Sequence, residues 1–205
     1  MCAPIMKHIP IALIYARLLI GFGIILLSVF HANHYSFLAI TLLSIGLLTD
    51  VFDGIIARKL NISSEKLRRL DSSIDQVFFI SVAVATYLQC PDFFKANLSK
   101  LIVLGAFEAS TYALSYIKFK KEIATHSIGA KVWTLILFAT LVEIMVHCES
   151  VVLFELCLWI GLATRLEILA IVFTLKKWTN DVPTIYHAVK LRQGKEIKRN
   201  KLFNG

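Results

Sequence analysis

The sequence lacks any polar segment long enough to form a soluble domain. Of its 205 residues, 57% are hydrophobic and 18% are charged, and the mean hydropathy is +0.70. This composition excludes an ordinary soluble domain of the same length. The chain is therefore predicted to be an integral membrane protein.

Two further absences narrow the choice of function. The four cysteines show no zinc-type spacing, which argues against a structural zinc site. No recognisable nucleic-acid-binding module accompanies the net charge of +8, so we expect no nucleic-acid partner. Cys90 and Cys148 fall near the outer ends of two predicted helices, so a disulfide between them is geometrically conceivable. Sequence alone does not establish their proximity, and we expect both thiols to be unpaired.

The hydrophobic residues gather in six runs. Each is close to the ~20 residues that a helix needs to cross the hydrocarbon layer, and the third reaches that length if it begins at Asp71. The first run has no clear small-residue cleavage site, so we assign it to a helix and not to a signal peptide. We predict an all-α bundle of six transmembrane helices at residues 10–30, 36–56, 75–88, 101–117, 132–147 and 151–175.

Basic residues lie mostly on one side of this topology. They are frequent in the 58–70 loop, in the 118–131 loop and in the tail, and the positive-inside rule places these segments and both termini in the cytoplasm. The charge suits either contact with anionic lipid or attraction of a phosphate-bearing substrate. We expect a multi-pass protein of a bacterial cytoplasmic membrane that contacts membrane lipids.

The chain shows no internal repeat and no low-complexity segment. We expect one membrane domain over residues 1–178 and a basic cytoplasmic tail over residues 179–205. Within that tail, residues 184–201 are compatible with an interfacial basic helix and equally with a solvated end.

Four aspartates stand out in this apolar chain, because a carboxylate near hydrocarbon is costly unless it is compensated. Asp50 and Asp53 are three residues apart, and Asp71 and Asp75 are four apart, so each pair shares one helix face. If the two helices run antiparallel, all four carboxylates converge on the predicted cytoplasmic side. Oxygen ligands favour hard divalent cations, so we predict a site for two Mg²⁺ or Mn²⁺ ions.

This pattern resembles the signature of the CDP-alcohol phosphotransferase family. Seven of its eight fixed positions match at the right spacing, and the eighth, a glycine close to the nucleotide in the family, is Leu67 here. The matching residues are Asp50, Asp53, Gly54, Ala57, Arg58, Asp71 and Asp75. The predicted six-helix topology agrees with the same family.

The resemblance implies a reaction between a CDP-linked lipid donor and a small alcohol acceptor, with release of CMP, in a homodimer. By this similarity the four aspartates hold the two cations, and Asp75 also takes the proton of the acceptor hydroxyl. The nucleotide and phosphate site would be lined by Gly54, Ala57, Arg58 and Ser64. We expect transfer of a phosphatidyl group from CDP-diacylglycerol.

The acceptor is expected to be glycerol 3-phosphate, because Lys131 can hold its phosphate. Lys131 and Thr134 resemble the cluster that relatives place beside the acceptor, although a lysine at a helix start is also a common topological signal. Inositol, inositol phosphate, serine and a lipid alcohol stay open as acceptors. Arg17 and Arg165 are read either as phosphate ligands or as partners in interhelical pairs.

A second class of function is a divalent-cation transporter or binding protein. Transporters commonly place their acids at mid-membrane, in interrupted helices of paired repeats. Here the acids lie toward one predicted membrane edge and no repeat is present. The sequence therefore favours a metal-dependent membrane enzyme.

Overall fold

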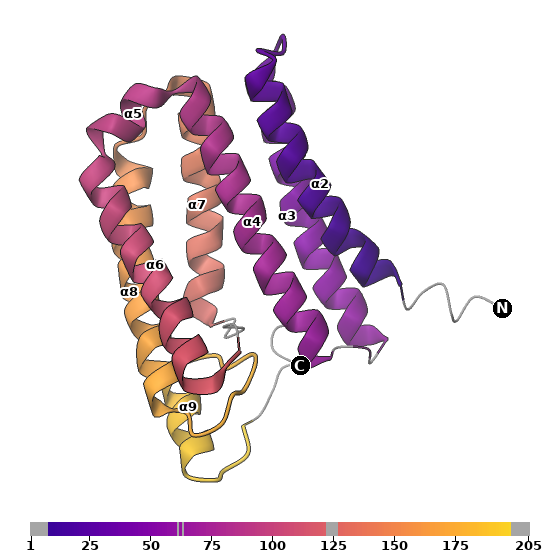
Figure 1. Cartoon of the computed structure of the whole chain (residues 1–205), viewed down its shortest axis with the longest axis vertical. Helices are drawn as coiled ribbons and strands as arrows, with labels where there is room; N and C mark the ends of the chain where they lie inside the picture. Colours follow the sequence, from indigo (N-terminus) through magenta and orange to yellow (C-terminus); the bar gives the residue numbers. More distant parts are fainter. Residues whose placement is uncertain (1–7, 61, 63, 122–126, 198–205) are drawn as a thin grey trace, which may run out of the picture. The chain divides into compact units, whose positions relative to one another are not determined.

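The computed structural model describes residues 8–60, 62, 64–121 and 127–197. Within these residues the secondary structure is helical, with no strand, which confirms the predicted all-α class (Figure 1). The helices are α2 (Ile9–Val29), α3 (Tyr35–Lys59), α4 (Glu65–Gln89), α5 (Pro91–Ala96), α6 (Leu98–Phe119), α7 (Ile128–His147), α8 (Val152–Thr174) and α9 (Ile185–Arg192).

A helix occupies each of the six predicted positions, but four of the described helices are long and apolar enough to cross a membrane. These are α2, α3, α7 and α8. Helices α4 and α6 carry more polar and charged side chains, which lowers their hydropathy. Four candidate spans are thus supported, and the count of six stays a prediction.

Helix α4 begins earlier than the hydrophobic pattern predicted. It starts at Glu65, because Ser64 caps it by accepting a hydrogen bond from the Leu67 backbone N–H at 3.2 Å. Glu65 in the first turn also suits the positive end of the helix dipole. As a result, Asp71 and Asp75 lie well inside a continuous helix.

Contacts divide the chain into two compact units. The first comprises Met1–Lys95 with Leu141–Glu149, and in it α2 packs against both α3 and α4 (Figure 1). The ring of Phe78, on α4, is 1% exposed and lies against Gly21 of α2 and Gly46 of α3. A side chain on Gly46 would collide with this ring, so small residues let the three helices approach closely.

Cys90 and Cys148 form a disulfide bond, so the expectation of unpaired thiols was wrong. Their Cα atoms are 5.2 Å apart, although 58 residues separate them in sequence. Cys90 caps the C-terminus of α4, and Cys148 directly follows α7. The two helix ends meet in the first unit, which is a long-range contact that residue spacing cannot reveal.

The second unit comprises Ala96–Thr140 with Ser150–Gly205. In it α8 packs against α6 and α9, and Ala188 of α9 is buried in an apolar cluster with Ile171, Leu175 and Val182. For residues 184–201 the sequence was compatible with either a basic helix or a solvated end. Helix α9 supports the first alternative from Ile185 to Arg192. Residues 198–201 lie outside the described part of the chain.

Candidate active site

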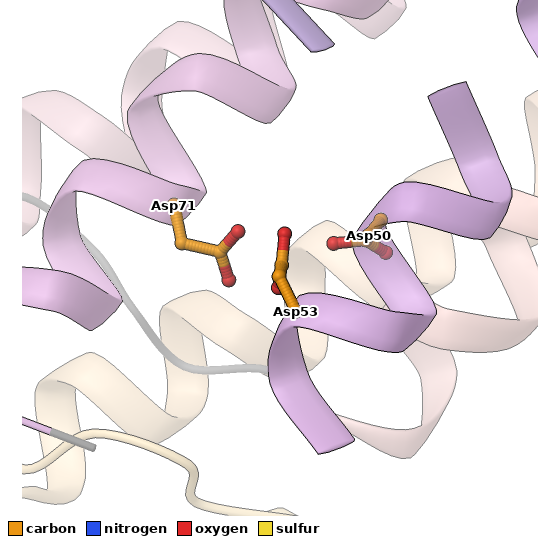
Figure 2. Close-up of side chains that lie close together, drawn as sticks. All are labelled: Asp50, Asp53 and Asp71. Atoms are coloured by element: carbon orange, nitrogen blue, oxygen red, sulfur yellow. The ribbon is translucent and has the colours of Figure 1, made fainter. Parts of the chain in front are cut away.

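Two helices of the first unit bring carboxylates together. Asp50 and Asp53 project from α3 toward Asp71 on α4, and each of the three offers an oxygen that lies within 4.8 Å of the others (Figure 2). The predicted convergence of the two acidic pairs is therefore observed. Asp75 joins the group through a shared partner on α2.

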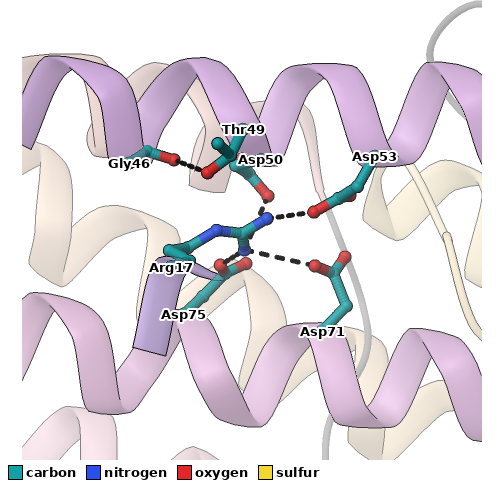
Figure 3. A network of polar contacts seen from close by, with 7 residues as sticks. All are labelled: Arg17, Gly46, Thr49, Asp50, Asp53, Asp71 and Asp75. Carbon is teal, nitrogen blue, oxygen red and sulfur yellow. Dashed lines mark hydrogen bonds and ion pairs between the residues drawn. The ribbon is translucent and has the colours of Figure 1, made fainter. Parts of the chain in front are cut away.

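That partner is Arg17, whose guanidinium lies between the two acidic pairs (Figure 3). Its Nη1 is 3.2 Å from Asp50 Oδ1, donates to Asp71 Oδ1 at 3.2 Å, and also pairs with Asp75 Oδ1. Its Nη2 pairs with Asp53 Oδ2. A single side chain from α2 thus contacts acids on both neighbouring helices.

Burial makes this arrangement energetically demanding. Arg17 is 1% exposed, Asp53 2% and Asp71 5%, whereas the side chains of Asp50 and Asp75 are partly exposed. A buried charge is tolerated only when it is paired and hydrogen-bonded. Arg17 supplies one positive charge to four carboxylates, so the cluster keeps an excess of negative charge that further cations can balance.

A small pocket opens beside the carboxylates. Its walls come from the first unit and include both charged and apolar side chains. They are Pro10 and Ile14 of α2, Asp53, Gly54 and Ala57 of α3, and Leu67, Arg68 and Asp71 of α4. The acids therefore border a recess lined by small residues of α3, as the sequence predicted for Gly54 and Ala57.

The donor set fits a divalent cation. Three carboxylate oxygens within 4.8 Å of one another, with no sulfur or imidazole in the group, are hard ligands of the kind that Mg²⁺ and Mn²⁺ prefer. The side chain of Asp50 is 35% exposed, so one member of this group is accessible from outside the protein. The residues present thus match the predicted chemistry of the site.

Comparison with known proteins agrees with this geometry. The family model described as CDP-alcohol phosphatidyltransferase matches residues 7–176. The chain belongs to this family. No curated protein and no solved structure gives a significant match.

Membership of the CDP-alcohol phosphatidyltransferase family fixes the general activity. The protein is a phosphotransferase of the CDP-alcohol type, a membrane enzyme of phospholipid biosynthesis, and the family is generally dependent on divalent cations. Its substrates are a CDP-linked donor and an alcohol acceptor. The matched segment contains the acidic cluster and also α6, α7 and α8.

Other predicted residues take the following places in this CDP-alcohol phosphatidyltransferase. The guanidinium of Arg58 folds back over Gly54, where an added Cβ would lie 3.3 Å from Arg58 Nη1. Ser64 is the N-cap of α4, a structural role that is compatible with the predicted one. Leu67, at the one position that departs from the resembled signature, lines the pocket together with Arg68.

The predicted acceptor residues belong to the second unit. Lys131 and Thr134 lie on α7, and Thr134 donates its hydroxyl hydrogen to the Ala130 carbonyl at 3.0 Å. In the same unit Arg165 pairs with Glu108 and lies over the Trp133 ring, 4.3 Å from its centroid. The interhelical alternative for Arg165 is thus observed, and the acceptor role of Lys131 stays a prediction.

Sequence reasoning missed the central place of Arg17. It treated Arg17 as one of several polar residues in apolar helices, open to either a phosphate or a pairing role. The available signal was its position, because an arginine inside a spanning-length apolar helix requires a buried partner. The acidic cluster was the largest concentration of such partners in the chain.

Proposed function

We propose that this protein transfers a phosphatidyl group from CDP-diacylglycerol to a small phosphorylated alcohol, with glycerol 3-phosphate as the first candidate, and releases CMP. The observation that carries the proposal is the convergence of four carboxylates from α3 and α4 beside a recess lined by Gly54 and Ala57. That convergence lies within residues 7–176, which the family model matches.

The carboxylates divide into two groups by their surroundings. Asp50, Asp53 and Asp71 form the tight group that would hold divalent cations. When bound, such cations spread the negative charge that develops on the phosphoryl group and on the departing CMP. Arg58 and Arg68, which lie near or line the recess, can donate hydrogen bonds to the donor's phosphate oxygens.

Asp75 is the residue assigned to proton transfer. Its side chain is 25% exposed, against 3% for Asp53 and 8% for Asp71, and it lies outside the tight group, so an acceptor hydroxyl can reach its carboxylate. The hydroxyl oxygen attacks the phosphatidyl phosphorus, the bond from that phosphorus to the CMP oxygen breaks, and the hydroxyl proton passes to Asp75. The products are the new phosphodiester and CMP.

The transporter alternative is less well supported. Asp50 and Asp53 lie in the second half of α3, and Asp71 lies in the first third of α4. Neither helix is interrupted at its acids, whereas transporters commonly bind ions at broken helices. Family membership also identifies a transferase.

The disulfide supports a cytoplasmic orientation for the aspartates. Disulfides persist in oxidising compartments, which supports a location outside the cytoplasm for the end of α4 at Cys90. From Asp71 to Cys90 the helix extends about 28 Å at 1.5 Å per residue, close to the ~30 Å hydrocarbon thickness. The acids would therefore face the cytoplasm, in agreement with the basic loops.

Asp75→Asn is expected to lower CMP release from CDP-diacylglycerol about 100-fold or more, because it removes the proton acceptor. The assay uses purified protein, a panel of acceptors and Mn²⁺, with a chelator-treated sample that should be inactive. Asp92→Asn is the matched control, since Asp92 is an exposed acid whose partner is Lys95. Turnover by a folded Asp75→Asn protein equal to that of the control would contradict the assignment.

Lys131→Ala is expected to raise the KM for glycerol 3-phosphate about tenfold, because a charge-assisted bond to phosphate is lost. The KM for an acceptor without phosphate, such as serine or inositol, should change little if that acceptor is used at all. Lys177→Ala, at an exposed lysine after α8, serves as control. An equal change for both kinds of acceptor would refute a phosphate-binding role.

The disulfide should be reducible only from the non-cytoplasmic face. Cys148 is exposed, so an impermeant reductant can reach its sulfur, and a polymer-linked maleimide then reports both thiols as a gel shift. We expect labelling in right-side-out but not in inside-out vesicles, using a variant without Cys2 and Cys157. Cys90→Ser supplies the control, because its Cys148 reacts without reduction. Labelling restricted to inside-out vesicles would reverse the orientation.

A further inference from the structure

The guanidinium of Arg17 uses the same carboxylates that would hold divalent cations. Its two terminal nitrogens contact oxygens of Asp50, Asp53, Asp71 and Asp75, which belong to two helices other than its own (Figure 3). Three of these acids form the group whose oxygens lie within 4.8 Å of one another. Arg17 is therefore placed at the centre of the cation site and not at its edge.

Arg17 disfavours a cation at this point both by the space that it occupies and by its positive charge. A Mg²⁺ or Ca²⁺ ion takes its oxygen ligands at about 2.0–2.6 Å, so carboxylates that share an ion approach it from all sides. The Nη1 atom of Arg17 lies 3.2 Å from oxygens of both Asp50 and Asp71, in the space between them. A positive group there also repels any second cation that approaches.

The contacts of Arg17 are extensive but incomplete. Its Nη1 and Nη2 are engaged by the acids, while its Nε is buried without a hydrogen-bond partner. A buried donor without a hydrogen-bond partner costs free energy. Withdrawal of the guanidinium from the acids therefore costs less than it would if all of its N–H groups were paired. A lysine could not make the same contacts as Arg17, because one ammonium group cannot span acids on two helices as the planar guanidinium does.

We propose that Arg17 is a built-in counter-cation that exchanges with divalent cations at the four aspartates. Its side chain holds α3 and α4 together at the acidic site when no cation is bound, and it withdraws from the carboxylates when cations bind. The affinity of the site for cations is thereby weakened by competition, so occupancy responds to cation concentration. This inference rests on the proposed function for its cation site, but not on the identity of the acceptor.

The test is a binding isotherm of Mn²⁺ alone, followed by electron paramagnetic resonance, on chelator-stripped full-length protein in detergent. Arg17→Gln should bind Mn²⁺ at least about tenfold more tightly than the native protein, because a competing charge is removed. Arg17→Lys should fall between the two. Lys66→Gln removes an exposed charge from the first turn of α4 and should leave the affinity within about twofold.

Thermal unfolding supplies a second readout that is independent of activity. In chelator, Arg17→Gln should melt at a lower temperature than the native protein, because the four carboxylates lose their shared partner. Mn²⁺ should raise the Tm of Arg17→Gln by more than it raises that of the native protein. A merely structural arginine would lower Tm without tightening Mn²⁺ binding.

Three results would overturn the exchange. They are equal or weaker Mn²⁺ binding by Arg17→Gln, failure of Arg17→Gln to fold even with Mn²⁺, and absence of Mn²⁺ binding by both proteins. The last would also remove the cation site from the proposed function. Conversely, tighter binding by Arg17→Gln together with no CMP release from any donor would support the exchange and reject the proposed function.

Discussion

Mutual repulsion among four aspartates is the constraint on which the first unit depends. Two of them, Asp53 and Asp71, are almost fully buried, and water cannot screen their charge effectively. Positive charge between the two helices reduces this repulsion. Arg17 supplies it from a third helix, so the site needs α2 although α2 contributes none of the acids.

Close helix packing makes that ion-pair network possible. Gly21 and Gly46 lie one turn from Arg17 and Asp50 along their helices, and both rest on the Phe78 ring of α4. Small side chains at these positions bring the three helices within reach of one guanidinium. Near the C-terminal end of α2, the Ser28 hydroxyl donates a hydrogen bond to the Ala85 carbonyl of α4 at 2.9 Å, which gives α2 and α4 a second contact.

The recess beside the acids connects this helix packing to the proposed phosphotransfer reaction. One wall carries charge, through Asp53 and Asp71, and another is made of small residues, Gly54 and Ala57. Such a combination admits a phosphate-bearing group close to bound cations. Leu67 makes this recess smaller than a glycine would.

The sequence by itself determined the membrane class, the all-α fold, the family, and the two acidic pairs, because hydrophobic run length and spacing along one helix are local properties. Only the tertiary structure decided that Arg17 joins the acids and that Cys90 bonds to Cys148. Arg17 and Asp71 are 54 residues apart, and the cysteines are 58 apart. Such contacts depend on which helix faces meet. For Arg17, the packing of Gly21 and Gly46 against Phe78 brings together the three helices involved, and this packing is a property of several helices together.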